Sequence, residues 1–154
     1  MRWTVGLLSA LLLARTAAPG QARVVRTDFC EVLNNAKQYD GKEITVRGTY
    51  LYWFETSELF CLTCRDKGKV WLEFVDLDEK SEAALRSGPG AGEINLTITG
   101  TFRTGSTYGH LNGYRHEFVA RRVWDVATVF KGIGKIDKEK AAEAKWACGG
   151  TNPR

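Results

Sequence analysis

The sequence lacks the short motifs that carry most of the well-known enzyme chemistries. It contains no G-x-S-x-G nucleophile elbow, no H-E-x-x-H zinc helix and no phosphate-binding P-loop. Its two histidines, His110 and His116, stand six positions apart, outside the usual short spacing of paired zinc ligands. These absences predict no cofactor and no metal ion, and they make enzymatic activity the less favoured interpretation.

Clustered positive charge is also missing from the central part of the chain, although the whole sequence carries a formal charge of +4. Residues 23–130 hold 14 basic and 15 acidic residues, whereas residues 131–154 hold six basic and three acidic ones. A groove for nucleic acid needs lysines and arginines gathered on the domain that holds the strand. We therefore expect no nucleic-acid partner, and we treat residues 131–154 as a basic C-terminal tail with a short helix, Asp137–Ala147.

Residues 1–22 have the composition of a secretory signal peptide. Arg2 supplies a positive start, Val5–Ala14 forms a short apolar core, and the small residues within Gly20–Ala22 suit a cleavage site. This apolar core is too short to cross a bilayer, and no other segment is apolar for long enough. The alternative interpretation is a buried N-terminal helix. The sequence thus predicts a secreted or periplasmic protein with no membrane span after cleavage and with one folded domain, residues 23–130.

The segment Tyr39–Trp53 is the clearest guide to the fold of that domain. It opens with an Asp-Gly turn and then alternates apolar with other residues, as a β-strand does. Gly48 stands in the middle, where a missing Cβ lets a long strand coil or bulge and so serve two sheets. Ile98–Thr104 repeats the Gly-Thr-aromatic pattern of Val46–Tyr52. Two strands with the same bend predict a small, strongly curved barrel.

The other elements follow from capping and alternation. Asp28 followed by Glu31 is a variant of the capping box at the start of a short helix, and Asp76 or Asp78 caps a second helix that ends at Gly88. Ile94, Leu96 and Ile98 alternate with Asn95, Thr97 and Thr99, which predicts that the first set points inward and the second outward. The expected strands are one from Glu43 to Trp53, one within Trp53–Lys67, and Gly68–Asp76, Glu93–Arg103 and Tyr114–Val129, with a loop at Thr104–Gly113 and a bulge at Arg121-Arg122.

The order of these elements is strand, strand, strand, helix, strand, strand, which is the order of the OB-fold barrel. The predicted fold class is therefore mainly β. We expect a five-stranded OB-like barrel with a short N-terminal helix, a helix between strands 3 and 4, and a short C-terminal helix.

Several of these segments also resemble a known group of sequences. Between about Asp28 and Val126 the chain contains, in order, F-C-x-V-L, Y-D-G-K-x-I-x-V-R-G-x-Y, F-E-T-S-x-L, V-W-L-E-F, I-T-G-x-F and Y-G-H-L-x-x-Y. This pattern resembles uncharacterised secreted bacterial proteins of OB-like build. The resemblance implies the fold and assigns no activity. One departure is the pair Cys61 and Cys64, where a single cysteine is expected.

The chain has four cysteines, Cys30, Cys61, Cys64 and Cys148, which allow three complete pairings. Export to an oxidising compartment favours disulfides over zinc. We favour a local Cys61–Cys64 bridge, with Cys30–Cys148 joining the two terminal helices. A redox role for the C-x-x-C segment would place its first sulfur at a helix N-terminus. Its flanks resemble a strand and a charged turn, so a redox role is not favoured.

The candidate site lies at one end of the predicted barrel. In OB folds, the loops that join strands 1–2 and 4–5 flank the usual binding face. Here those loops combine aromatic rings with hydrogen-bonding groups, which suits stacking on a sugar ring or another flat ligand. The alternative is that the rings only plug the barrel end. The candidate ligand-binding residues are Trp53, Glu55, Ser57, Tyr108, His110 and Tyr114.

Three classes of function remain open at this stage. A binding module for a small ligand should leave an aromatic cleft open between the two loops, whereas a protein-interaction module should bury those rings and expose a flat patch elsewhere. A small enzyme could use Glu55 and His110 as an acid–base pair if the carboxylate reaches the imidazole beside a cavity. We favour a non-enzymatic module that binds a small ligand or a protein partner, neither of which the sequence identifies.

Overall fold

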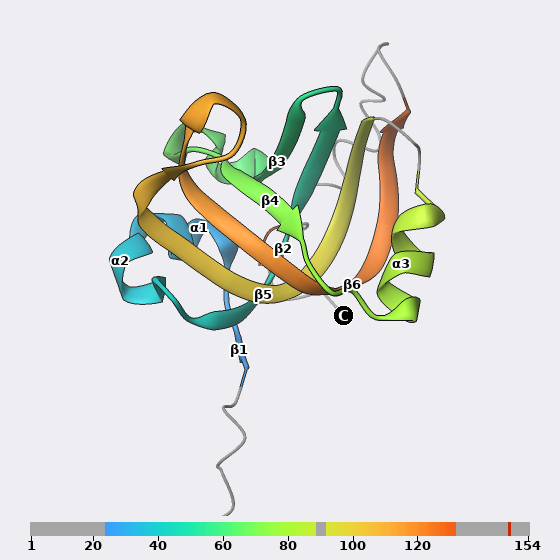
Figure 1. Cartoon of the computed structure of the whole chain (residues 1–154), viewed down its shortest axis with the longest axis horizontal. Helices are drawn as coiled ribbons and strands as arrows, with labels where there is room; N and C mark the ends of the chain where they lie inside the picture. Colours follow the sequence, from blue (N-terminus) through green and yellow to red (C-terminus); the bar gives the residue numbers. More distant parts are fainter. Residues whose placement is uncertain (1–23, 89–91, 132–147, 149–154) are drawn as a thin grey trace, which may run out of the picture.

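The structure, a computed structural model, describes residues 24–88, 92–131 and 148, and this part of the chain is mainly β-sheet (Figure 1). The signal segment 1–22 and the predicted tail helix Asp137–Ala147 lie outside the described residues. Among the described residues, no helix has the length and apolar character needed to cross a membrane. The elements in chain order are β1 (Val25–Arg26), α1 (Phe29–Asn34), α2 (Ala36–Tyr39), β2 (Glu43–Trp53), β3 (Thr56–Phe60), the 3-10 helix η1 (Leu62–Lys67), β4 (Val70–Phe74), α3 (Glu79–Arg86), β5 (Gly92–Tyr108), the 3-10 helix η2 (His110–Asn112) and β6 (Tyr114–Lys131).

Five of these strands close into a ring. Antiparallel pairing joins β2 to β3, β3 to β4, β5 to β6 and β5 back to β2, whereas β4 and β6 run parallel. The short β1, which the sequence did not predict, adds to β2 as a parallel neighbour. The five expected strands and the helix between the third and the fourth are all confirmed.

The strand β2 serves two neighbours, as its central glycine predicted. It pairs with β5 over Glu43–Tyr52 and with β3 over Thr49–Trp53. A Cβ on Gly48 would lie 2.9 Å from Leu59 Cδ1 and 3.2 Å from the carbonyl oxygen of Phe60. The absence of that carbon therefore lets β3 approach where β2 turns from one neighbour to the next.

The predicted bulge in the last strand is confirmed, and it lies opposite a second glycine. Thr99 pairs with Arg122 but Gly100 pairs with Ala120, so Arg121 is the extra residue. A Cβ on Gly100 would collide with the backbone of β6 at the carbonyl of Val119. The two long strands β5 and β6 therefore curve together around the ring (Figure 1).

The interior of the ring is apolar, and the predicted inward residues Ile94, Leu96 and Ile98 belong to it. The residues predicted to point outward, Asn95, Thr97 and Thr99, are not exposed to solvent, because all three are buried. Their polar atoms find partners inside the protein, as burial requires. Thr45 Oγ1 lies 2.6 Å from Thr99 Oγ1, and Thr49 Oγ1 donates to Asn95 Oδ1 at 2.9 Å.

Two local expectations were wrong in part. The predicted loop Thr104–Gly113 begins too early, because β5 continues to Tyr108, paired with β6 at Thr104–His116 and Tyr108–Tyr114. Only the 3-10 turn η2 and its flanking glycines remain outside the hairpin. The N-terminal capping box is also only half formed.

Asp28 accepts hydrogen bonds from the backbone N–H groups of Cys30 and Glu31 and so caps α1. The carboxylate of Glu31, however, accepts from the side chain of Asn35 at 2.8 Å. The helix between β4 and β5 is capped by Asp78, the second of the two predicted candidates, which accepts from Ser81 N–H at 2.8 Å.

Candidate functional site

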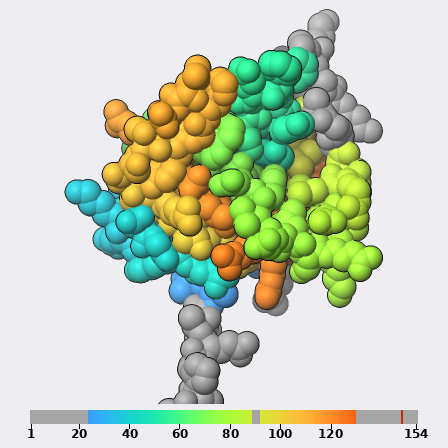
Figure 2. All heavy atoms as spheres, viewed as in Figure 1, coloured from blue at the N-terminus to red at the C-terminus, as the bar shows by residue number. Residues whose placement is uncertain are grey.

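A cleft of about 430 Å³ opens between the turn that joins β2 to β3 and the turn η2. In Figure 2 the tip of the β5–β6 hairpin and the β2–β3 turn stand on either side of atoms from β4. These are the two loops that the sequence assigned to the candidate site. The residues that line the cleft are Tyr52, Phe54, Glu55, Thr56, Ser57, Trp71, Gly109 and His110.

Trp71 on β4 forms one wall of the cleft, and Gly109 lies directly against it. Gly109 has a φ angle of +67°, and a Cβ at this position would collide with the indole ring. The ring of Trp71 also contacts that of Tyr114, with 5.2 Å between the ring centroids. The indole is therefore held between the start of η2 on one side and the first residue of β6 on the other.

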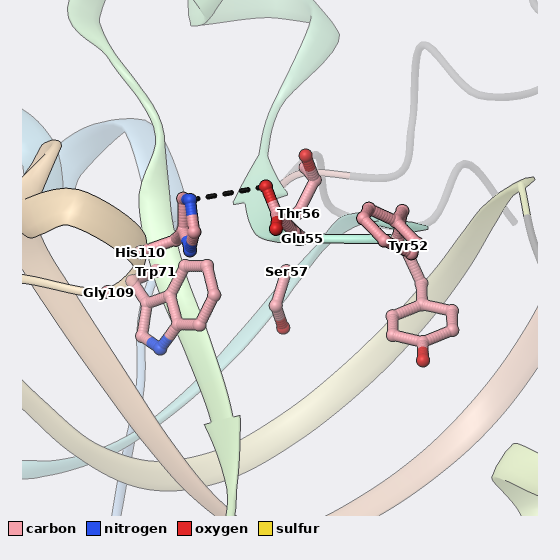
Figure 3. Close-up of a pocket in the computed structure, with 8 residues that line it drawn as sticks. Tyr52, Glu55, Thr56, Ser57, Trp71, Gly109 and His110 are labelled. Carbon is pink, nitrogen blue, oxygen red and sulfur yellow. Dashed lines mark ion pairs between the residues drawn. The ribbon is translucent and has the colours of Figure 1, made fainter.

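Glu55 and His110 meet at the rim of the cleft. Glu55 Oε2 lies 3.2 Å from His110 Nε2, and both side chains are partly exposed, at 57% and 41%. Figure 3 shows the two groups facing each other, with the indole of Trp71 beside the imidazole. This contact links the β2–β3 turn to η2 and places one acid and one base next to the cavity.

A buried carboxylate lies near the wall that Trp71 forms. Glu58 is opposite Trp71 in the β3–β4 register, and its Oε1 accepts a hydrogen bond of 2.6 Å from the Tyr114 hydroxyl. The ammonium of Lys69 forms an ion pair with the same oxygen. Burial, with a further contribution from Glu58, holds the pKa of the Tyr114 phenol well above its ordinary value. The phenol therefore stays protonated and keeps donating.

The predicted site residues fall into two groups. Glu55, Ser57 and His110 line the cleft. Trp53 is the last residue of β2, next to the same turn, and is 44% exposed, but it is not among the lining residues. Tyr114 does not line the cleft, but it contacts the ring of Trp71 and donates a hydrogen bond to Glu58. Tyr108 does not line the cleft either, and its hydroxyl donates to the Thr104 carbonyl oxygen at 3.3 Å.

The hydroxyl of Ser57 is already engaged by the protein. It donates to the carbonyl oxygen of Leu72 and lies 3.4 Å from the Tyr50 hydroxyl. In Figure 3 it points away from the ion pair. Ser57 therefore contributes to the shape of the cleft and fixes the end of β3 against β4.

Sequence reasoning missed the contribution of Trp71, which stands in the predicted strand Gly68–Asp76 and was not among the candidate site residues. The partly exposed indole lies opposite the core residues Val70 and Leu72 on the strand. Its signal in the sequence is the alternation itself, since a large aromatic ring facing away from the core is available for contacts at the surface.

A second hollow, of about 310 Å³, lies on the other side of Tyr52. It lies between the end of α3 and the ring, and an ion pair between Arg86 and Glu82, 3.0 Å apart, belongs to α3 at its edge. Tyr52 lines both cavities, so its half-exposed ring divides them. The lining residues are Tyr50, Tyr52, Phe74, Leu85, Arg86, Gly92 and Ile94.

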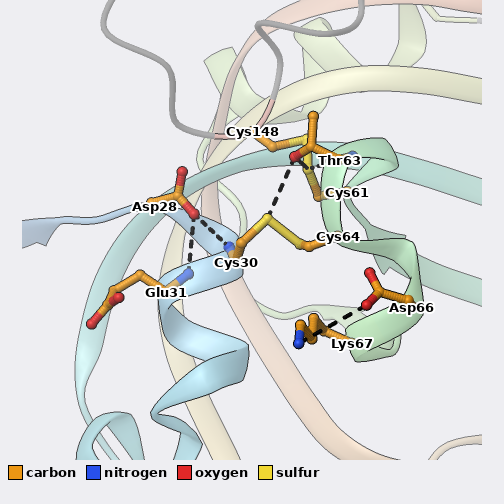
Figure 4. The surroundings of a disulfide bond; sticks show 9 residues. All are labelled: Asp28, Cys30, Glu31, Cys61, Thr63, Cys64, Asp66, Lys67 and Cys148. Atoms are coloured by element: carbon orange, nitrogen blue, oxygen red, sulfur yellow. Dashed lines mark hydrogen bonds and ion pairs between the residues drawn. A yellow bond between two sulfur atoms is a disulfide. The ribbon is translucent and has the colours of Figure 1, made fainter.

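The disulfide pairing that we favoured from the sequence is wrong. The structure joins Cys30 to Cys64 and Cys61 to Cys148, with Cα–Cα distances of 5.9 and 5.7 Å (Figure 4). Each bridge therefore takes one cysteine of the C-x-x-C segment and connects it to a distant part of the chain. The pairing follows from the contact between α1 and η1, which places Cys30 beside Cys64.

The expected strand before the C-x-x-C segment is confirmed, because β3 ends at Phe60, and the expected charged turn after it is a 3-10 helix. Residues Leu62–Lys67 form the 3-10 helix η1, and Cys61 is its N-cap. The Thr63 N–H donates to Cys61 Sγ at 3.4 Å, and the Thr63 hydroxyl lies 2.9 Å from the same sulfur. The first cysteine of the segment thus follows a strand, as expected, and caps a short 3-10 helix.

Comparison with known proteins finds no matching family model, no matching curated protein and no matching solved structure. What the chain and its fold define is a mainly β domain whose five-stranded ring carries an aromatic cleft at one end. The geometry of that cleft is therefore the guide to function.

Proposed function

We propose that this chain is a secreted or periplasmic OB-like barrel that binds a small flat-faced ligand, of which a sugar ring is the best candidate. Binding takes place in the cleft between the β2–β3 turn and η2. The protein holds the ligand without transforming it.

The OB-like assignment is supported by the order of strands around the ring. The order around the ring is β2, β3, β4, β6, β5 and back to β2. In the chain, the helix α3 lies between β4 and β5. The cleft lies between the connections of the first two and the last two of those strands, where OB folds bind their ligands. Export is supported by the two disulfides, since such bonds persist in oxidising compartments.

The observation that carries the binding proposal is the open aromatic cleft. Phe54 is 88% exposed and Tyr52 is 48% exposed, so these rings do not plug the end of the ring of strands. A cavity of 430 Å³ lies within the size range of small-molecule sites. An interaction module would instead bury the rings, which disfavours that alternative.

The lining offers both kinds of contact that a sugar needs. Exposed aromatic faces stack on the apolar face of a sugar ring, while its hydroxyl groups require hydrogen-bonding partners around the edge. The Glu55 carboxylate, the His110 imidazole and the Thr56 hydroxyl surround the aromatic walls. The contact between Glu55 and His110 presents a carboxylate oxygen and a ring nitrogen that can exchange partners with ligand hydroxyls.

The proposal is tested by titrating the protein calorimetrically with common mono- and disaccharides. Phe54→Ala removes a ring that lines the cleft, and Trp53→Ala removes the neighbouring ring, which does not line it. We expect Phe54→Ala to weaken binding about tenfold and Trp53→Ala to leave it within twofold, in line with the contribution of one stacked ring. Equal effects of the two substitutions, or no heat with any sugar, would refute the proposal.

A second candidate function follows from the 3.2 Å contact between Glu55 and His110. A carboxylate that holds an imidazole at the edge of a cavity is the arrangement of a base and the group that orients it. In this reading His110 accepts a proton from a bound substrate or from water, and Glu55 fixes the ring. Chromogenic glycosides and esters test it, because turnover that is abolished by His110→Gln and reduced by Glu55→Gln would establish the enzyme.

A further inference from the structure

The four cysteines form one compact group on the side of the fold where α1 meets η1. The sulfur atoms of Cys30, Cys61 and Cys64 all lie within 4.8 Å of one another, and the fourth sulfur, of Cys148, is bonded to Cys61. The hydroxyl of Thr63 connects the two disulfides, since it lies 2.9 Å from Cys61 Sγ and 3.5 Å from Cys30 Sγ (Figure 4). A sulfur of one bridge is thus close to a sulfur of the other.

Exposure differs sharply within this group. Cys61, Cys64 and Cys148 are 0%, 5% and 3% exposed, whereas Cys30 is only partly buried. An external thiol therefore reaches Cys30 first. Access to the attacked sulfur governs the rate of thiol–disulfide exchange, so the bridge between Cys61 and Cys148 is protected from direct attack.

The backbone permits a third pairing, between Cys61 and Cys64. The Cys64 N–H donates to the Cys61 carbonyl oxygen at 3.3 Å, which closes a turn over the intervening two residues. A turn of this kind brings its end Cα atoms within about 7 Å. That separation is at the edge of the range that a disulfide bridges.

We infer that the group acts as an internal thiol–disulfide relay, through which a small thiol that attacks Cys30 opens the buried bridge to Cys148. This is an activity separate from ligand binding, and it does not depend on the cleft. Its substrate class is a low-molecular-weight thiol such as glutathione.

The relay has three steps. In the first, the thiolate of glutathione attacks Cys30 Sγ, which forms a mixed disulfide and expels Cys64 as a thiolate. In the second, Cys64 attacks the neighbouring Cys61 Sγ, which forms the Cys61–Cys64 bond and expels Cys148, and Cys148 then takes up a proton. In the third, a second glutathione attacks the mixed disulfide and leaves Cys30 as a thiol.

The atoms and electrons balance over these steps. Two glutathione thiols become one glutathione disulfide, and the two protein disulfides become one disulfide and two thiols, at Cys30 and Cys148. The product carries the local C-x-x-C bridge. Cys148 is held to the domain by its disulfide to Cys61 and by its carbonyl oxygen, which accepts a hydrogen bond from the Phe29 N–H at 3.3 Å. Opening the disulfide leaves only the hydrogen bond of these two.

The experiment is a time course of mild reduction with glutathione, without denaturant, followed by alkylation, digestion and mass mapping. The relay predicts an intermediate that is alkylated at Cys30 and Cys148 and retains the Cys61–Cys64 bond. An intermediate alkylated at Cys30 and Cys64, with the Cys61–Cys148 bond still intact, would overturn it. This mapping of the natural chain decides the matter even if substituted chains fail to fold.

A double variant, Cys30→Ser with Cys64→Ser, supplies the matched control. It keeps the buried bridge between Cys61 and Cys148 and lacks the partly exposed sulfur of Cys30. Glutathione therefore has to attack Cys61 or Cys148 directly. We expect Cys148 to become alkylated about tenfold more slowly than in the natural chain, because both sulfurs are shielded. Equal rates in the two folded proteins would show that no relay operates.

Discussion

Gly109 lies against the indole ring of Trp71 so closely that no side chain fits between them. Its backbone, at φ +67° and ψ −164°, also occupies a region that residues with a Cβ rarely adopt. The turn of the β5–β6 hairpin therefore packs directly against the cleft wall, which requires a glycine at this position. This relationship fixes where His110, the next residue, can reach.

Substitution of Gly109 by alanine should disturb both the fold and the cleft. The backbone strain alone costs about 1–3 kcal/mol, and the collision with Trp71 adds to it. We expect a loss of stability in that range or above, measured by urea denaturation, together with a shift in tryptophan emission. Gly105→Ala is the control, because Gly105 also has a positive φ, of +88°, but a Cβ added there would meet no other atom within 4 Å. Identical losses from the two substitutions would contradict the proposed contact.

Gly100→Ala tests the close approach of β5 to β6 at the bulge. A methyl group there meets backbone atoms of Val119 and Ala120, which cannot move without breaking the pairing. We expect a loss of about 3 kcal/mol or more. Gly48→Ala should cost about 1 kcal/mol, since its nearest neighbour is the end of the flexible Leu59 side chain. Thermal and chemical unfolding of both variants provide the measurement, and the reverse order of losses would be incompatible with this packing.

Tyr114→Phe removes the phenol that donates to the buried Glu58 carboxylate. A hydrogen bond to a charged group is worth about 1.5–3 kcal/mol, and we expect a loss of stability of that size. Lys69 remains as the other partner of Glu58. A change in the emission of Trp71 should accompany the loss, because the two rings are in contact. A fully stable Tyr114→Phe protein would show that this hydrogen bond carries little energy.

His116 predicts a dependence of stability on pH. Burial, with a smaller contribution from Arg115, lowers the pKa of His116 below its ordinary value of 6.5. The unfolded chain therefore binds a proton more readily than the folded one, and stability falls as the pH drops from about 6.5 through the lowered pKa. In the fold the ring stacks on Phe102, and its Nδ1 lies 2.8 Å from Thr104 Oγ1.

We expect the stability of His116→Gln to decline less steeply than that of the natural chain between about pH 7 and pH 5. Arg115→Gln should change the slope by a smaller amount, because burial is the larger cause of the lowered pKa. Urea denaturation at a series of pH values gives the comparison. Parallel curves for His116→Gln and the natural chain would exclude this role for His116.

The alternating strands and the glycines were predictable from the sequence because both are local signals. Ile94, Leu96 and Ile98 recur with period two, and they are all in the core. The slip at Arg121 marked the bulge, since one extra residue breaks the same period. Gly48 likewise indicated where β2 passes from one neighbour to the next.

The disulfide pairing and the cleft wall were not predictable in the same way. The C-x-x-C spacing permits a local bridge, and only the contact between α1 and η1 decides that Cys64 meets Cys30 instead. Similarly, alternation shows that Trp71 faces away from Leu72 without showing that η2 folds over it. Thr104–Tyr108 has the composition of a loop, yet the pairing of Thr104 with His116 and of Tyr108 with Tyr114 keeps the segment within β5.

Binding of a flat-faced ligand in the cleft can be observed through the indole N–H signals in NMR spectra during a titration with mono- and disaccharides. Trp71 lines the cleft, whereas Trp124 on β6 is partly exposed and does not line it. We expect at least one sugar to shift the Trp71 signal to saturation and to leave the Trp124 signal in place. If no sugar moves the Trp71 signal, or if both signals move together, the proposed binding in the cleft is wrong.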